Sequence, residues 1–311
     1  MSKRASGLSK ILDVSSEKDT NLRKRLSKIS KSKKAVLLAF IAPYVGKRVS
    51  PTRILSAELG ISEEFGVESV INDIRKKSKC QTLYLVINSP GGFVSSSYKV
   101  ARALRKSFKK IVVFVPHVAA SGGTLVALAG NQIVMGVMSQ LSPLDPHGSV
   151  GGERIYAKSI VDGFDTVTSF FRKIRVEDAP YTYKVLADKY DAEKLDVAVS
   201  ALSLMEDYLC EILDGCGYKK AKVKEIARAF VRGFKNHSEV ITLEKAQKTG
   251  LKAVGNDKYQ EEWDAMRDWL ETYLLTSADK HIIRYVVSQD LIKANGNKII
   301  KKAKPKIPES T

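Results

Sequence analysis

The chain has 311 residues, enough for one large domain or two small ones with a well-buried core. Its 52 Lys and Arg against 34 Asp and Glu give a formal net charge of +18, which favours polyanionic partners but specifies no chemistry. Three scattered cysteines exclude a disulfide framework and a zinc cluster, and the apolar run 35–45 is too short to span a bilayer. Because a polar, basic segment stands where a secretory signal would be, the sequence predicts a cytoplasmic protein without a transmembrane segment.

Both ends of the chain are rich in lysine. Residues 1–34 contain eleven Lys or Arg and three acidic residues, and we expect a solvated basic arm with one helix near 19–31. Residues 293–311 predict a flexible basic tail, since 293–306 hold six lysines and no acid. Such ends favour nonspecific nucleic-acid contact through phosphates, whereas the scarcity of interleaved aromatics argues against base stacking.

The middle of the chain alternates short apolar runs with helical patterns. The run 35–42 (AVLLAFIA) is flanked by charge and predicts a buried strand, as do 82–87, 111–115 and 132–135. Helices are expected between these strands, at 64–77, 94–107 and 122–129. This rhythm predicts parallel βαβ crossovers and an α/β fold with its sheet covered on both faces.

The second half of the chain is expected to be mostly helical. Residues 155–234 have helical character throughout, and 240–251 predict a short strand, a turn and a small helix that ends at Gly250. Residues 259–275 predict an amphipathic helix whose apolar side belongs either to the core or to an interface. The apolar residues of that side are Trp263, Met266, Trp269, Leu270 and Leu274.

Two glycine-bearing turns carry the chemistry. Ser89-Pro90-Gly91-Gly92 follows one predicted strand and Ala119-Ala120-Ser121-Gly122-Gly123 follows the next, at the sheet edge where open α/β folds bind ligands. Acyl transfer needs a nucleophile beside two backbone N–H groups directed at the developing oxyanion. The pattern therefore predicts Ser121 as a nucleophile, with the N–H of Gly92 or Phe93 and that of Gly122 as oxyanion donors. Glycine lets a substrate approach these groups closely.

The runs INSPGGFV, PHVAASGGTLVALAGNQIVMG and SQLSPLDP resemble the superfamily of Clp proteolytic subunits, signal peptide peptidases and crotonases. Within it, HSEVITLEKAQKTGL is similar to the late segment of the SDH-type (serine dehydrogenase proteinase), SppA-like peptidases. The resemblance implies a ClpP/crotonase-like fold of repeated ββα units over 35–255, followed by a helical extension at 256–292. It also implies an ATP-independent serine peptidase that acts on peptides or unfolded protein, with Ser121 as nucleophile, a site at Gly91, Gly92, Phe93 and Gly122, and a homo-oligomeric state.

The general base is left open between two residues. His147 follows Ser121 by 26 residues, about the spacing in Clp subunits, although the motif alignment places Asp145 nearer to that histidine's position. In the branch of the superfamily that the Asp-Pro pair resembles, a lysine serves as base, which implies Lys158. Lysine acts as a base only where burial disfavours its charged form.

The remaining histidines carry less weight. His117, His237 and His281 are each expected to be structural or solvent-facing, with His281 in a late, peripheral helix. For His237, the resemblance implies a place that is either structural or near the substrate groove. No cluster has metal-ligand spacing and no Walker A or GxGxxG pattern occurs, so neither a metal nor a cofactor is predicted. Two alternatives stay open: a crotonase-type acyl-CoA enzyme, and a non-catalytic scaffold for nucleic acid or a protein partner.

Overall fold

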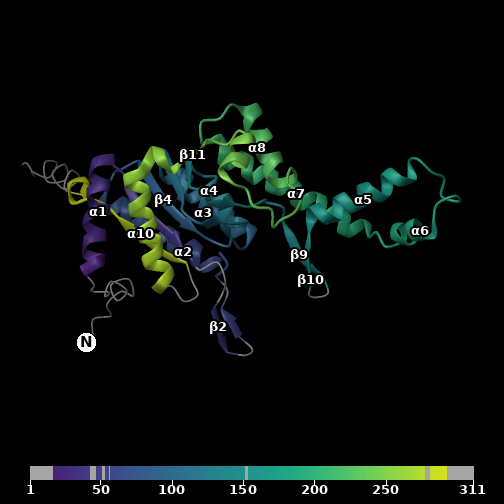
Figure 1. Cartoon of the computed structure of the whole chain (residues 1–311), viewed down its shortest axis with the longest axis horizontal. Helices are drawn as coiled ribbons and strands as arrows, with labels where there is room; N and C mark the ends of the chain where they lie inside the picture. The colour runs from purple at the N-terminus through teal and green to yellow at the C-terminus, as the bar shows by residue number, and fades with distance from the viewer. Residues whose placement is uncertain are drawn as a thin grey trace, which may run out of the picture.

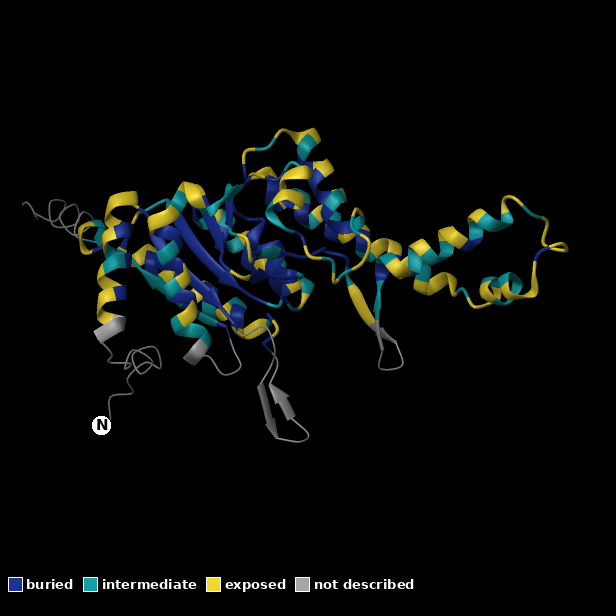
Figure 2. Cartoon of the chain, in the orientation of Figure 1, coloured by how far each residue is buried: buried dark blue, intermediate teal, exposed yellow. Residues whose placement is uncertain are grey.

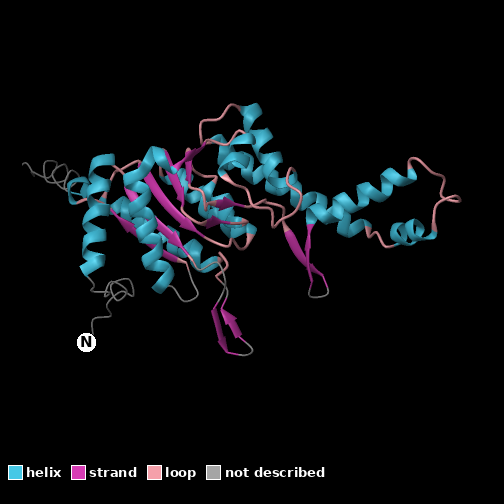
Figure 3. Ribbon diagram, viewed as in Figure 1, coloured by secondary structure: helices cyan, strands magenta, loops and turns pink. Residues whose placement is uncertain are grey.

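The computed structural model describes residues 17–42, 47–50, 53–55, 57–150, 153–276 and 281–292. Its centre is a sheet of six strands in the order β11-β7-β5-β4-β1-β12 (Figures 1 and 3). All neighbours are parallel except β12, which pairs antiparallel with β1. The strands of this sheet are β1 (Val36–Ile41), β4 (Thr82–Asn88), β5 (Lys110–Val115), β7 (Gln132–Met135), β11 (Ala253–Gly255) and β12 (Ile282–Val286). The predicted α/β fold and its four parallel strands are confirmed.

Both faces of the sheet are buried, as the dark blue strands in Figure 2 show. In β1, alternate residues belong to different cores: Leu38 and Phe40 lie on one face, and Leu37 and Ala39 on the other. An all-apolar strand is the pattern expected of a parallel sheet that is covered on both sides. The first core is covered mainly by α2 (Ile61–Lys77), α3 (Val94–Ser107), α4 (Gly122–Ala127), α7 (Ala192–Asp214), α8 (Lys220–Arg232) and α9 (Leu243–Lys248).

The opposite face is covered by two helices from the ends of the described chain. The first, α1 (Glu17–Lys33), buries Leu22, Leu26 and Ile29, so this part of the predicted arm is packed rather than solvated. Spacings of four and three residues place these side chains on one helical face. The second is α10 (Gln260–Thr276), after a short 3-10 turn, η1 (Asn256–Tyr259).

The apolar side of α10 lies inside the protein. Its residues Trp263, Met266, Trp269 and Leu270 are buried against β1, β4 and α1, which decides between the two alternatives that the sequence left open. The segment after it corrects a second expectation. His281 lies in no helix: it directly precedes β12, and its side chain is fully buried. The basic tail 293–311 lies outside the described residues.

Short paired segments surround the sheet. The pairs are β2 (Lys47–Ser50) with β3 (Arg53–Leu55), β6 (Val118–Ala119) with β8 (Gln140–Leu141), and β9 (His147–Val150) with β10 (Glu153–Tyr156). The β9–β10 hairpin leads into an arm that projects from the body (Figure 1). This arm consists of α5 (Ala157–Phe171), α6 (Tyr181–Asp188) and the start of α7, and most of its surface is exposed (Figure 2). Among the described helices, none has the length and apolarity to cross a membrane.

Candidate active site

Ser121 occupies a strained turn between β6 and α4. Its backbone has φ 49° and ψ −123°, a conformation that L-residues rarely adopt. Its N–H donates to Ser142 Oγ at 2.6 Å, and Ser142 N–H donates to Thr124 Oγ1 at 3.0 Å. Thr124 Oγ1 in turn donates to Ala119 O at 2.7 Å. A sharp, strained strand-to-helix turn that presents a serine hydroxyl is the geometry of a nucleophile elbow.

The turn at residues 89–92 is in direct contact with the Ser121 turn. Ala120 N–H donates to Ser89 O at 2.9 Å, which joins the strand ends. Gly91 has φ +92°, and a Cβ at this position would lie 2.6 Å from Ala120 O and from Gly122 N. No side chain fits there, so glycine is required both for its backbone conformation and for the close approach of the two turns.

The sequence left two candidate oxyanion donors on this turn, the N–H groups of Gly92 and Phe93, and hydrogen bonds to Leu59 decide between them. Leu59 N–H donates to Gly91 O at 2.7 Å, and Phe93 N–H donates to Leu59 O at 2.9 Å. The N–H of Phe93 is therefore already engaged. The described chain contains no cis peptide bond, so the N–H of Gly92 points opposite to the carbonyl of Gly91 and away from Leu59. Gly92, Ser121 and Gly122 all line the same cavity.

This cavity has a volume of about 740 Å³, and a histidine–carboxylate pair lines it together with the two turns. His237 Nδ1 lies 2.6 Å from Asp145 Oδ1, and Asp145 is buried. The ring of Tyr156 stacks on that of His237, with centroids 4.6 Å apart and planes at 24°. Since a carboxylate only accepts hydrogen bonds, it places the hydrogen of the neutral ring on Nδ1 and leaves Nε2 as an acceptor.

The two bases considered from the sequence lie in different places. His147 lines the cavity, exposed, with its ring 6.0 Å from that of His237. Lys158 lies in the first turn of α5, where its ammonium forms an ion pair with Asp162 one turn further on. Lys158 is not among the residues that line the cavity.

His237 and Asp145 are the functional candidates that sequence reasoning missed. The sequence favours a structural or solvent-facing His237 and gives it no catalytic role, although the resemblance allows a place near the substrate groove. In the structure its side chain is only 15% exposed and lies on the cavity wall. The two residues are 92 positions apart, so no local spacing reveals the hydrogen bond. The available signal was chemical: Asp145 stands near the position where the resemblance implies a catalytic histidine.

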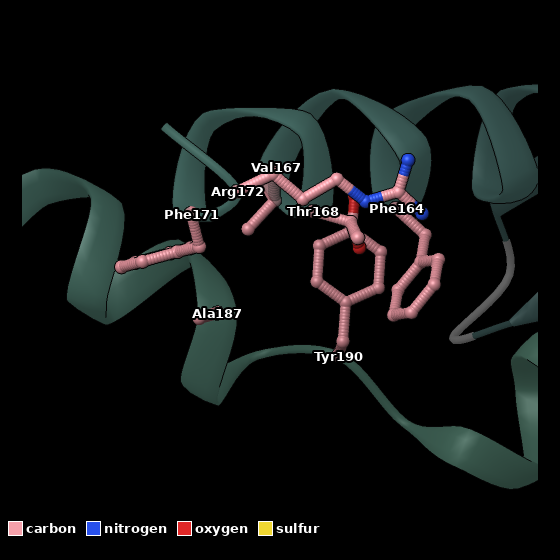
Figure 4. A pocket seen from close by; sticks show the side chains of 7 residues that line it. All are labelled: Phe164, Val167, Thr168, Phe171, Arg172, Ala187 and Tyr190. Atoms are coloured by element: carbon pink, nitrogen blue, oxygen red, sulfur yellow. The ribbon is translucent and has the colours of Figure 1, made fainter. Parts of the chain in front are cut away.

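A second cavity, of about 320 Å³, lies within the arm between α5 and the end of α6 (Figure 4). Its walls are mostly apolar, and Phe164 and Tyr190 meet edge to face beside it at 5.5 Å. It holds no acid and no histidine. Within the described ranges, no three His, Cys, Asp or Glu side chains are grouped to hold a metal ion.

A family model described as ClpP-like SDH-type serine proteinase matches residues 61–297. Two uncharacterized proteins of Methanocaldococcus jannaschii are 31% identical over 187 residues and 29% identical over 192 residues. These matches cover 59% and 61% of the chain and 57% and 58% of the relatives, so the chain spans little more than half of their length.

The chain also resembles proteins of known structure. Two structures of the membrane-bound stomatin-specific protease 1510-N are similar, with TM-scores of 0.42 and 0.40 and identities of 15% and 17%. They cover 66% and 63% of the chain, and 79% and 70% of their own chains. The second is a lysine-to-alanine mutant in complex with a substrate peptide.

Proposed function

The chain belongs to the ClpP-like SDH-type serine proteinase family, and on that premise we propose that it hydrolyses peptide bonds with Ser121 as nucleophile. One observation carries the proposal. A serine in a strained turn shares a cavity with the Gly92 and Gly122 backbones and with a hydrogen-bonded His237–Asp145 pair. These are the groups that acyl transfer requires: a nucleophile, a base with its orienting carboxylate, and oxyanion donors.

In the proposed mechanism, His237 is the general base. Nε2 takes the proton of Ser121 Oγ while the oxygen attacks the scissile carbonyl, and the N–H groups of Gly92 and Gly122 bind the oxyanion. The imidazolium that forms is stabilised by Asp145 and returns its proton to the leaving amine. Water, activated by the same ring, then hydrolyses the acyl enzyme.

The Ser–Lys dyad implied by the resemblance remains an alternative mechanism. To act as the base, Lys158 would have to leave Asp162 and reach the cavity, whereas His237 is already on the cavity wall. His147 also lines the cavity, with its ring packed edge to face against Tyr156 at 5.5 Å, whereas His237 has the 2.6 Å contact with Asp145 that orients a catalytic imidazole. The geometry thus favours His237 over both residues.

The substrate that we propose is an extended peptide or an unfolded protein. One edge of the segment 91–93 is occupied by Leu59, which bonds to Gly91 O and Phe93 N–H. The other edge, which carries Gly92, faces the cavity, and a peptide strand placed there would bring its carbonyl to Ser121. The walls near it combine apolar Phe93, Val94 and Met205 with the polar groups described above.

A serine-reactive fluorophosphonate tests the proposal directly. We expect the parent protein to be labelled and to cleave fluorescent casein, and Ser121→Ala to lose both properties. His237→Gln and Asp145→Asn should slow labelling by about 10³-fold or more. Lys158→Ala and His147→Ala serve as matched variants and should retain most of the rate.

The outcomes separate the mechanisms. Loss of labelling in Lys158→Ala but not in His237→Gln would establish the dyad and overturn His237 as base. A parent that is neither labelled nor proteolytic, yet turns over an acyl-CoA, would favour the crotonase-type alternative. A parent without either activity that binds nucleic acid at low salt would favour the scaffold.

A further inference from the structure

A second histidine–carboxylate pair lies behind the turn at residues 89–92. His281 directly precedes β12, far along the chain from the residues of the cavity, and its side chain is fully buried. Its ring packs on Phe40 of β1, with centroids 4.4 Å apart and planes at 33°. The antiparallel pairing of β12 with β1 therefore brings His281 beneath the end of β4.

The ring of His281 contacts a hydroxyl that holds the turn. His281 Nε2 lies 2.8 Å from Ser89 Oγ, and the same oxygen accepts the N–H of Gly91 at 3.1 Å. Ser89 is itself fully buried. A hydroxyl that accepts from Gly91 has its own hydrogen available for Nε2, which it donates when the ring hydrogen is on Nδ1.

On its other side, the ring faces Glu63 at the start of α2. His281 Nδ1 lies 3.8 Å from Glu63 Oε1, a distance at which the contact is electrostatic rather than a hydrogen bond. Burial alone would raise the pKa of Glu63. The His281 ring, the Gly60 N–H and the Ser62 hydroxyl together lower that pKa to about 2, so the group is a carboxylate at neutral pH.

Glu63 also fixes the other side of the same turn. Its Oε2 accepts the Gly60 N–H at 2.8 Å, and the adjacent Leu59 N–H donates to Gly91 O at 2.7 Å. The N–H of Gly91 is thus held through Ser89 and His281, and its carbonyl through Leu59. Both supports lead back to the one carboxylate. Because the Gly91 carbonyl and the Gly92 N–H belong to one planar peptide group, fixing the first orients the second.

We propose that Glu63 and His281 are positioning residues for oxyanion binding, acting through Ser89 and Leu59 to orient the N–H of Gly92. This inference rests on the proposed function. The series Glu63, His281 and Ser89 supplies a carboxylate, an imidazole and a hydroxyl, which is the composition of a catalytic triad. Ser89 and His281 are buried, however, and have no access to substrate. Its role is to hold a backbone group that must be in place before charge develops.

Two variants test the proposal by different routes. His281→Phe retains the packing on Phe40 and removes both ring nitrogens, and Glu63→Gln keeps the size of the side chain and removes its charge. Glu64→Gln is the matched control, because Glu64 lies on the same helix and bonds to Ser96 and Lys99 away from the cavity. Rates are expressed per folded molecule.

We expect both variants to slow fluorophosphonate labelling of Ser121 and to lower kcat for casein by about 10- to 100-fold, with KM within two-fold of the parent. A misplaced oxyanion donor affects the tetrahedral state and not substrate binding. Glu64→Gln should behave as the parent. Unchanged labelling in both variants, or an effect confined to KM, would overturn the proposal.

Nuclear magnetic resonance provides a readout that does not depend on activity. The ring ¹⁵N shifts of His281 should report a hydrogen on Nδ1 and an unprotonated Nε2, and Glu63→Gln should shift these signals and the Gly91 amide. If the parent is not labelled, the proposed function fails while this measurement still stands. If the His281 and Gly91 signals do not respond to Glu63→Gln, the proposal that Glu63 acts through His281 on this turn is refuted, whatever the activity.

Discussion

Replacing Ser121 with glycine should stabilise the protein while abolishing its activity. At φ 49° and ψ −123°, an L-residue in such a sparsely populated region costs about 1–3 kcal/mol, and glycine adopts the conformation without that cost. Glycine also increases the conformational entropy of the unfolded chain, which cancels about 0.4–1 kcal/mol of the stabilisation gained by relieving this strain. The net gain of Ser121→Gly over Ser121→Ala is then about 0.5–2 kcal/mol. Alanine is the proper reference because both variants lose Oγ.

Urea unfolding followed by circular dichroism measures this difference, provided that the two m-values agree. The corresponding rise in Tm is roughly 1–8 °C, at about 2–4 °C per kcal/mol for a domain of this class. Lys34, the other non-glycine residue with positive φ in the described chain, is exposed at the end of α1 and serves as a control. Lys34→Gly should also stabilise, since glycine is favoured after a helix. If Lys34→Gly stabilises and Ser121→Gly is no more stable than Ser121→Ala, the strain at the nucleophile is refuted.

Three further predictions concern the surroundings of Ser121. Gly91→Ala places a Cβ 2.6 Å from the backbone atoms Ala120 O and Gly122 N, so it should abolish fluorophosphonate labelling and lower Tm. A variant that is still labelled and stable would show that the turns at 89–92 and at Ser121 can move apart without loss of the site. Ser142→Ala removes the acceptor of the Ser121 N–H and should cost about 1–3 kcal/mol in urea unfolding and slow labelling. The buried Ser139, which accepts the Gly136 N–H, is its control: Ser139→Ala should cost similar stability but leave labelling intact. Because the pKa of Glu63 is lowered to about 2, its ionised side chain should contribute up to roughly 3 kcal/mol to the free energy of unfolding. This contribution should be complete above pH 4.5 and vanish as the pH falls toward 2. The difference in unfolding free energy between the parent and Glu63→Gln must therefore shrink over that range.

The sheet was predictable because its strands are short, wholly apolar runs between helical patterns. The sequence of β1 alone indicates burial on both faces, and the glycine turns follow from their position after β4 and β5. The packing of α1 was missed because the eleven Lys and Arg of residues 1–34 outweighed the regular spacing of Leu22, Leu26 and Ile29. Their contacts with α10 join the two ends of the described chain, which local patterns cannot reveal.

The histidine pairs were not predictable from spacing. Asp145 and His237 meet through the fold of the helical region, and His281 reaches Ser89 only because β12 adds to the sheet beside β1. The segment 282–286 (IIRYV) is rich in β-branched residues, which favours a strand. What the sequence does not state is that this strand pairs with β1 and so brings a histidine beneath the first glycine turn.

Burial assigns different roles to two sets of the same three groups. A carboxylate, an imidazole and a serine occur both as Asp145, His237 and Ser121 and as Glu63, His281 and Ser89. The first imidazole is partly exposed on a cavity wall, so it can exchange protons with a bound substrate. The second is sealed in the core, and its only polar contacts in the described structure are protein groups that fix a backbone turn. A strained nucleophile needs such a frame, because a turn free to move would let the serine relax toward an ordinary conformation and carry the oxyanion donors out of place.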